Sequence, residues 1–335
     1  RALSIEEPDR VPVTELGINT PVMEQIIGRR PLAACSDASS LSDSELRLRR
    51  VRLEVEARVE TYEKLGMDMV GSPYGVADSF VSKAPGPGQV LGEWAEVYEV
   101  RPPYSGLWYV RGMIDGPEDY ESFPKPDPHA KGRMDMILET VRQVKGKMAV
   151  LGQAYHGWKQ AFQMRGIDGI LTDLYLRPDF AERMFSDNNR FFIEVIKGMV
   201  DSGADVISLQ DDFADVKGPW MSPRLFRRFL APIISSAVEA IHRKGLPAVL
   251  HCDGNLYPVL EDLAATGIDG LHAIEPAAGM EIGRVKALYG DRLCLLGNID
   301  CSITLPLRSV AEVEAEVKGC GPSGRTHPHV EQLDP

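Results

Sequence analysis

The sequence lacks the features of a membrane protein and of a nucleic-acid-binding protein. No apolar run approaches the roughly 20 residues that a membrane-spanning helix needs, and the amino end lacks the residue order of a signal peptide. Lysine and arginine number 37 against 49 acidic residues, which gives a formal net charge of -12. The basic residues are never clustered in the way that binding of a phosphate backbone requires. We therefore expect a cytoplasmic protein whose partners include neither nucleic acid nor a membrane.

Cysteine is scarce, and its spacing excludes two further classes of protein. The five cysteines include no CxxC pair, and a chain of 335 residues does not depend on a disulfide framework. No GxGxxG follows the first apolar run, so the phosphate-binding turn of a dinucleotide-binding fold is missing. We expect reduced thiols and a fold of another kind.

Seven short apolar runs are present, and they alternate with longer helical patterns. Near-continuous apolar strands suit a parallel sheet that is buried on both faces. Alternation of such strands with helices is typical of a (β/α)8 TIM barrel or of a doubly wound open sheet, and the strand count favours the barrel. The predicted strands are residues 11–16, 67–72, 148–154, 205–212, 247–254, 270–276 and 293–300.

An eighth strand has no counterpart in the sequence. Sixteen residues follow the last predicted helix, 309–319, and none of them forms an apolar run. We expect that this strand is missing from the sequence or that the barrel is incomplete, and that residues are absent at both ends. The sequence predicts a single barrel domain over residues 1–335.

Residues 88–114 interrupt the alternation after the second strand. Two aromatic, alternating segments joined by Pro-Pro-Tyr-Ser-Gly predict an inserted β-hairpin. Loops at this end of a barrel cover the active site, so its aromatic residues are candidates for a substrate lid. The alternative is that they pack on one another and on a partner subunit. These residues are Trp94, Tyr98, Tyr104, Trp108 and Tyr109.

Polar side chains gather where the predicted strands end. In a TIM barrel the carboxyl ends of the strands converge on one mouth, which holds the active site. We assign substrate binding to six residues at or near the strand ends: Glu15, Ser72, Gln153, Trp158, Gln210 and Asn298.

Two further residues of the strand ends, Asp211 and His156, are predicted to be catalytic. Asp211 and Asp212 are consecutive, so their side chains alternate and only one looks into the barrel. Close like charges raise the pKa of one carboxyl, which suits an acid or a base but also results from ordinary crowding. His156 is a candidate proton donor, and the alternative for it is surface packing beside a tryptophan.

The stretch "AVLHCDGN" predicts a metal site. His251 and Asp253 are two residues apart, so on an extended strand they point to one face and Cys252 to the other. Glu275 ends the next strand. One imidazole and two carboxylates can ligate zinc, which keeps one position open in catalytic sites. A metal-free functional site, or a histidine that only orders the barrel mouth through a hydrogen bond, remains an alternative.

Three long stretches resemble the uroporphyrinogen decarboxylase superfamily. They are "SDNNRFFIEVIKGMVDSGADVISLQDD", "VLHCDGNLYPVLEDLAATGIDGLHAIEP" and "LYGDRLCLLGNID", and the likeness continues in order through nearly the whole chain. The resemblance implies a (β/α)8 barrel. This superfamily includes the tetrapyrrole decarboxylase of haem synthesis and zinc methyltransferases that exchange methyl groups with a corrinoid protein.

Within this superfamily the sequence resembles the methyltransferase branch more closely. The Arg-Gln-Ala-Gly-Arg stretch of the decarboxylases has no counterpart near "LGINTPVMEQIIGRR", and Phe162 stands where they carry a tyrosine. Thiol-methylating members have a motif similar to His-x-Cys-Gly-Asn, and "HCDGN" places Asp253 at the cysteine position. The resemblance, with the oxygen-rich set His251, Asp253 and Glu275, implies activation of an ether or phenolic oxygen.

The functional hypothesis follows from this resemblance. We expect a zinc-dependent methyltransferase that moves a methyl group from a small methylated donor, such as an O-methyl aromatic compound, to a corrinoid protein that carries cobalamin. One alternative is a metal-free decarboxylase that acts on a carboxylate or tetrapyrrole. Another is a non-catalytic barrel that binds a corrinoid or tetrapyrrole protein. The chain is also a candidate homodimer.

Overall fold

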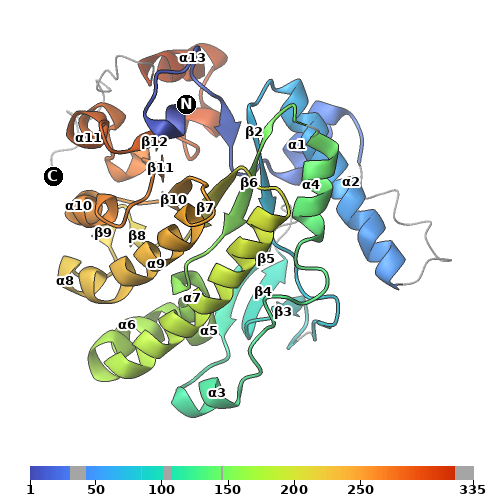
Figure 1. Cartoon of the computed structure of the whole chain (residues 1–335), viewed down its shortest axis with the longest axis vertical. Coiled ribbons are helices and arrows are strands. Elements are labelled where there is room, and N and C mark those ends of the chain that lie inside the picture. Colours follow the sequence, from blue (N-terminus) through green and yellow to red (C-terminus); the bar gives the residue numbers. More distant parts are fainter. Residues whose placement is uncertain (31–42, 84, 101–106, 145, 321–335) are drawn as a thin grey trace. The chain divides into compact units, whose positions relative to one another are not determined.

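A parallel sheet dominates the computed structural model, which describes residues 1–30, 43–83, 85–100, 107–144 and 146–320. Seven strands of these residues form the sheet, and each falls on one of the seven predicted apolar runs (Figure 1). This order of parallel strands and intervening helices confirms the TIM-barrel-like α/β class. In sheet order the strands are β1 (Thr14–Glu15), β2 (Met69–Pro73), β6 (Ala149–Ala154), β7 (Val206–Gln210), β10 (Ala248–Cys252), β11 (Gly270–Ala273) and β12 (Cys294–Leu296).

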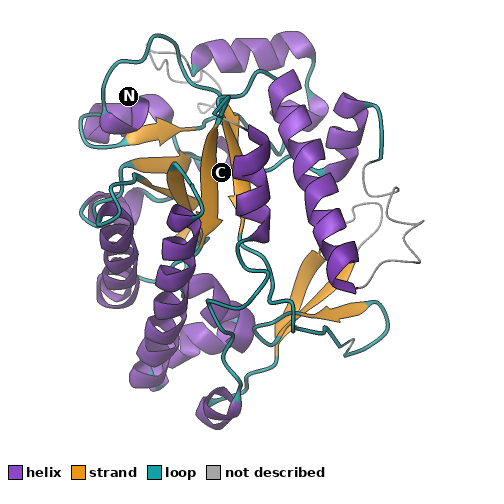
Figure 2. Ribbon diagram, turned by 45° about the vertical axis from the view of Figure 1, so that its right-hand side comes forward, coloured by secondary structure: helices purple, strands orange, loops and turns teal. Residues whose placement is uncertain are grey.

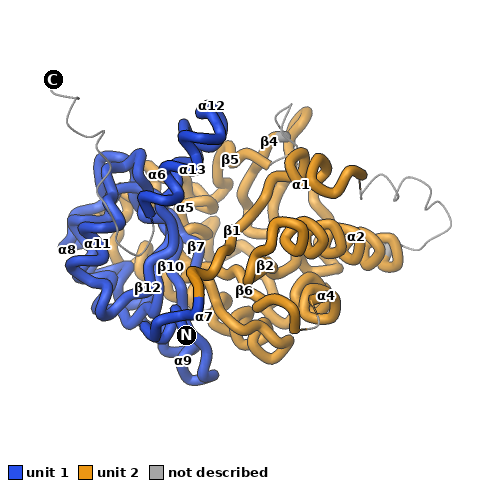
Figure 3. The backbone as a smooth tube through the Cα atoms, turned by 90° about the horizontal axis from the view of Figure 1, so that it is seen from above, with its two compact units in different colours: residues 1–9, 209–335 blue, residues 10–208 orange. Residues whose placement is uncertain are grey.

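The chain divides into two compact units (Figure 3). Unit 2 is residues 10–208, and unit 1 is residues 1–9 together with the chain from residue 209 onward. The division falls inside β7. One barrel domain over residues 1–335 stays a prediction.

Unit 2 packs its helices through regularly spaced apolar residues. In α7, Phe185, Phe192 and Met199 recur every seven residues and are buried, which is the spacing of one helix face. Helices α2 and α4 lie side by side, and Gln143 Nε2 of α4 donates to the Arg52 carbonyl of α2 at 3.3 Å. The helices of this unit are α1 (Thr20–Ile27), α2 (Asp43–Lys64), α3 (Pro117–Ser122), α4 (Asp135–Val144), α5 (Trp158–Arg165), α6 (Ile167–Leu176) and α7 (Pro178–Asp201).

A separate antiparallel sheet occupies the predicted insertion in unit 2 (Figure 2). Its strands are β3 (Gln89–Leu91), β4 (Glu96–Val100) and β5 (Leu107–Gly112). The hairpin predicted after the second strand is confirmed as β4 and β5, and β3 adds a third strand. Trp94 is buried edge-to-face against Phe191, with ring centroids 4.7 Å apart, whereas Trp108 is exposed. Tyr104 lies outside the described residues, and the lid role of this insertion stays a prediction.

Unit 1 contains the parallel strands β10, β11 and β12. Val249 pairs with Gly270 and His251 with His272, while Gly270 pairs with Cys294 on its other side. Its helical segments are η1 (Ala2–Ser4), α8 (Pro223–Leu225), η3 (Phe226–Leu230), α9 (Ala231–His242), η4 (Tyr257–Val259), α10 (Leu260–Ala264), η5 (Pro276–Ala278), α11 (Ile282–Tyr289), α12 (Thr304–Leu307) and α13 (Val310–Gly319), and β8 (Ala214–Asp215) pairs with β9 (Gly218–Pro219). Among the described helices of the chain, none combines the length and apolar character that a bilayer crossing requires.

Candidate metal centre

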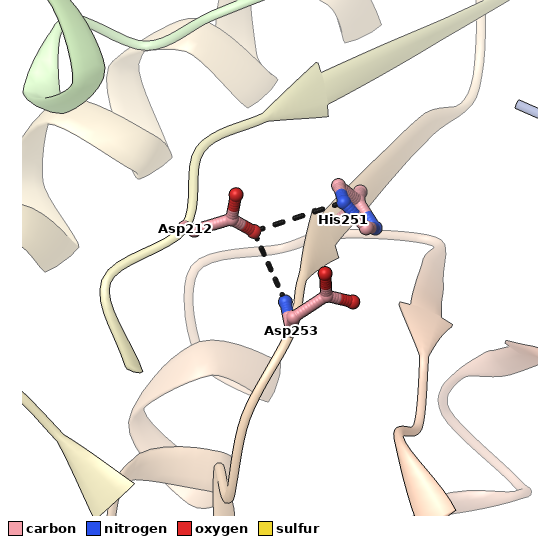
Figure 4. Close-up of side chains that lie close together, drawn as sticks. All are labelled: Asp212, His251 and Asp253. Carbon is pink, nitrogen blue, oxygen red and sulfur yellow. Dashed lines mark hydrogen bonds and ion pairs between the residues drawn. The ribbon is translucent and has the colours of Figure 1, made fainter. Parts of the chain in front are cut away.

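Three side chains of unit 1 meet where β7 and β10 end (Figure 4). Asp212 follows β7, His251 lies in β10 and Asp253 follows that strand. One donor atom from each, an imidazole nitrogen or a carboxylate oxygen, lies within 4.8 Å of the other two. His251 Nε2 is 3.7 Å from Asp212 Oδ1. We call these three residues the donor trio.

Main-chain hydrogen bonds hold the loop that carries Asp253. Three consecutive N–H groups of this loop have acceptors: the Asp253 N–H donates to Asp212 Oδ1 at 3.1 Å, and the Gly254 N–H donates to Glu275 Oε2 at 2.7 Å. The Asn255 N–H donates to the Asp215 carbonyl at 2.8 Å. These acceptors come from the segments that follow β7 and β11, so the loop is tied to both neighbours of β10.

A second histidine contacts the trio from β11. His272 pairs in register with His251, and because the strands are neighbours and parallel, both side chains lie on one face of the sheet. The two Nδ1 atoms are 2.8 Å apart, which is a hydrogen bond. Since Nδ1 of His251 is engaged in this way, its Nε2 is the nitrogen that faces Asp212.

Cys252 is turned away from the donor trio. It is fully buried, and its Sγ accepts from the Phe213 N–H at 3.4 Å and donates to the Asp253 carbonyl at 3.1 Å. Burial raises the pKa of this thiol well above its usual value, so it stays protonated. A protonated, buried thiol is an unsuitable metal ligand.

The surroundings of the site keep His272 neutral and bring two carboxylates, Asp212 and Asp253, close enough to repel each other. Removal from water, together with the neighbouring His251, lowers the pKa of His272 to about 3. Desolvation raises the pKa of Asp253; His251 acts against this shift and Asp212 adds to it by repulsion. A cation between the two carboxylates would relieve that repulsion.

The chemistry and spacing of the donor trio fit zinc. Imidazole nitrogen and carboxylate oxygen are both zinc ligands, and bonds of about 2.1 Å place tetrahedral donor atoms about 3.4 Å apart. The donor atoms of the trio lie within 4.8 Å of one another, so small side-chain movements would be needed to bring them to that spacing. Three protein donors leave a fourth position open, as catalytic zinc sites require.

The other strand-end residues of unit 1 contact the backbone or are buried. Asp211 is fully buried, and its N–H donates to the His251 carbonyl at 3.2 Å. Glu275 is half-buried and binds the Gly254 N–H, as described above. Asn298 is buried and donates through Nδ2 to the Ile274 and Met280 carbonyls.

Gln210 is the last residue of β7, and unlike the side chains just described its amide nitrogen has no hydrogen-bond partner among the described residues. This nitrogen, Nε2, is buried. A buried amide donor left without an acceptor costs about 1–3 kcal/mol, so a bound molecule that accepts from it would be stabilised.

The remaining predicted site residues belong to unit 2. Glu15 is exposed, and its Oε1 accepts from the Leu16 N–H at 2.7 Å; Gln153 Nε2 donates to the Leu16 carbonyl at 2.7 Å. The Ser72 hydroxyl lies 3.1 Å from that of Thr140. His156 and Trp158, which precede and begin α5, are both fully buried.

Sequence reasoning missed two residues of the centre, Asp212 as a donor and His272 as its neighbour. Side chains alternate between the two faces after β7 as they do along β10, but the sequence does not show whether Asp211 or Asp212 lies on the same face as His251. The sequence offered one signal for His272, because it is a polar residue inside the apolar run 270–276. Only the alignment of the two strands shows that it lies beside His251.

Comparisons with known proteins identify the family. The family model for uroporphyrinogen decarboxylase (URO-D) matches residues 98–333. A uroporphyrinogen decarboxylase of Aromatoleum aromaticum is 28% identical over 229 residues, which are 64% of this chain and 58% of that protein. The methylcobamide:CoM methyltransferase MtaA of Methanosarcina barkeri is 27% identical over 192 residues, which are 56% of this chain and 55% of that protein. The matched part of the chain therefore spans less than two thirds of the length of these relatives.

A solved structure agrees with the assignment at the level of the fold. A methyltransferase from Methanosarcina mazei superposes with a TM-score of 0.72 at 22% identity, covering 95% of this chain and 86% of that one. Because the family model matches more than half of the sequence, the chain belongs to the uroporphyrinogen decarboxylase (URO-D) family.

Proposed function

We propose that the chain is a zinc-dependent methyltransferase that moves a methyl group from a small methylated donor, such as an O-methyl aromatic compound, to a corrinoid protein. The observation that carries this proposal is the donor trio, in which one imidazole and two carboxylates meet at the ends of neighbouring strands. The methyltransferase relative, whose name specifies a methylcobamide, supports the choice of reaction.

The proposed zinc ligands are His251 through Nε2, Asp253 and Asp212. The sequence predicted Glu275 as the third ligand, but the geometry favours Asp212, because the donor atoms of Asp212, His251 and Asp253 lie within 4.8 Å of one another and Glu275 does not belong to that group. We assign to Glu275 the role of holding the loop after β10. A bound zinc ion would supply Lewis acidity to the leaving oxygen of the donor.

The other residues would bind the donor and supply a proton. Gln210 has a buried amide N–H available to an acceptor atom of the substrate. Asp211, which belongs to the same unit as the trio, remains the predicted proton donor to the departing oxygen, which needs a proton as its bond to the methyl group breaks. The catalytic role of His156, a residue of unit 2, stays a prediction. The cobalt of the corrinoid partner would supply the electron pair that takes the methyl group, so the reaction would need no nucleophile from this chain.

Metal content and methyl exchange test the proposal together. Zinc in the purified protein is measured by elemental analysis, and free methylcobalamin serves as the corrinoid probe with a panel of phenols and thiols as methyl acceptors. We expect about one zinc per chain and methylated product, with both reduced at least about 10-fold in Asp212→Asn and Asp253→Asn. The control is Asp291→Asn, which removes an exposed carboxylate of unit 1 outside the trio. Full exchange activity in metal-free protein would refute the zinc mechanism.

A decarboxylase is the second candidate, because relatives with that name match the chain at 25 to 28% identity. A decarboxylase without metal would release carbon dioxide from uroporphyrinogen and would not depend on the donor trio. Carbon dioxide release that persists in Asp212→Asn and in chelator-treated protein, with no methyl exchange, would establish this candidate in place of the first.

A further inference from the structure

The contact between His251 and His272 suggests a function for the second histidine. Their Nδ1 atoms are 2.8 Å apart, and their rings are tilted by 46° with centroids 4.9 Å apart. Strand pairing sets this contact, because the two residues are partners in the register of β10 and β11. The contact therefore depends on the main chain of two buried strands and not on a mobile loop.

We propose that His272 is a positioning residue whose Nδ1 accepts a hydrogen bond from the Nδ1–H of His251, which fixes Nε2 of His251 as the metal-binding nitrogen. This inference rests on the proposed function, since it takes His251 to be a zinc ligand. It adds a residue that holds the ligand in its ring orientation and tautomer, a role that carboxylates and carbonyls often fill in zinc sites.

The direction of the hydrogen bond follows from the surroundings of His251. Its Nε2 lies 3.7 Å from Asp212 Oδ1, which is longer than a normal N–H···O hydrogen bond, so the Nε2 position is not committed as a donor to that carboxylate. A nitrogen that binds a metal must offer its lone pair, and the proton of a neutral ring is then on Nδ1. His272 must in turn keep its own proton on Nε2.

The hydrogen bond from His251 to His272 would keep the metal-binding nitrogen of His251 directed at the metal position. Without an acceptor at Nδ1, the His251 ring could rotate about its Cβ–Cγ bond or change tautomer, and either change removes the lone pair from the position between Asp212 and Asp253. Loss of a residue that orients a zinc-bound histidine typically lowers metal affinity by about 10- to 100-fold.

The position of the proton on His272 tests the inference in metal-free protein. Long-range proton–nitrogen correlation spectra of protein labelled with ¹⁵N-histidine report which ring nitrogen of each histidine carries hydrogen. We expect His272 to be protonated on Nε2 and unprotonated on Nδ1. A proton on Nδ1 of His272 would mean that His272 donates to His251, and the inference would be overturned.

Zinc affinity provides the second readout, by competition with a chromophoric chelator. His272→Phe keeps a ring but removes the acceptor, and we expect about a 10- to 100-fold loss of affinity. His272→Asn keeps an oxygen that can accept at the same distance from the backbone, and it should recover most of this loss. The matched control is His242→Phe, which changes an exposed histidine of α9 that pairs with Asp269.

These outcomes separate the inference from the proposed function. Wild-type affinity in His272→Phe, in protein that binds zinc, overturns the positioning role and leaves the methyltransferase proposal intact. If the wild-type protein binds no zinc, the zinc proposal fails, and the inferred role of His272 toward a metal fails with it, whereas the proton position still reports the direction of the hydrogen bond.

Discussion

Gly254 follows Asp253 directly, and the structure predicts that it cannot be replaced by alanine without loss of stability. Its φ angle is +96°, in a region that L-residues rarely adopt. A Cβ atom at this position would lie 2.7 to 2.8 Å from three backbone atoms of Ala214 and Asp215. Backbone cannot rotate away as a side chain can, so the loop itself has to move.

The magnitude follows from the hydrogen bonds that such a movement breaks. The Gly254 N–H bond to the Glu275 carboxylate is charge-assisted and contributes about 2 kcal/mol, and the adjacent bond from the Asn255 N–H to the Asp215 carbonyl contributes about 1 kcal/mol. The unfavourable φ adds about 1 to 2 kcal/mol. Gly254→Ala should therefore destabilise unit 1 by about 4 kcal/mol.

Gly267→Ala is the matched control, because it shares the unfavourable backbone angle but not the close contacts. Its φ is +88°, and the nearest atom to an added Cβ is Val238 Cγ1 at 3.6 Å, an ordinary contact. Urea unfolding followed by circular dichroism should show a loss about 3 kcal/mol smaller for this variant. Hydrogen exchange of residues 248–256 would then locate the additional loss in Gly254→Ala. Equal losses in the two variants would refute the reasoning.

Three other outcomes can be predicted. Burial raises the pKa of Glu96 from 4.5 to about 7, so between these pH values the folded protein holds a proton that the unfolded chain has released. The free energy of unfolding should therefore fall by about 3 kcal/mol as the pH rises from 4.5 through 7. Urea titrations at several pH values should show that Glu96→Gln removes this decrease. Arg133→Met leaves the largely buried Glu93 carboxylate without its ion-pair partner and should cost about 3 to 5 kcal/mol by the same measurement. A cost under about 1 kcal/mol would contradict that role. Dialysis against a chelator should lower the melting temperature of the wild type but not that of Asp212→Asn, and equal shifts would argue against a metal at the trio.

The strands were predictable because their physical signal is local. Each apolar run indicates burial on both faces, and each of the seven runs overlaps a strand of the parallel sheet. The ends of the strands were less predictable. The run 270–276 continues past Ala273, where β11 ends, so Glu275 was placed on the strand although it lies in the loop before η5. Apolar residues continue past the last backbone hydrogen bond between the paired strands. The sequence alone therefore does not show where the strand ends.

The choice between Asp211 and Asp212 shows a second limit of the sequence. Alternation correctly requires the two side chains to differ, but a shift of one residue in register exchanges their faces. The pairing of the Asp211 N–H with the His251 carbonyl sets this register, and it places the Asp212 carboxylate beside His251. The contact between His251 and His272 likewise depends on the relative alignment of two strands, which no single run contains.

The loop after β10 owes its shape to main-chain N–H groups, so that shape does not depend on which side chain stands at position 253. Exchanging Asp253 for cysteine would bring sulfur into the trio without rebuilding the loop, and selectivity should move toward softer ions such as Cd²⁺ or Cu⁺. We therefore expect this one substitution to change the metal selectivity of the site while the fold stays the same.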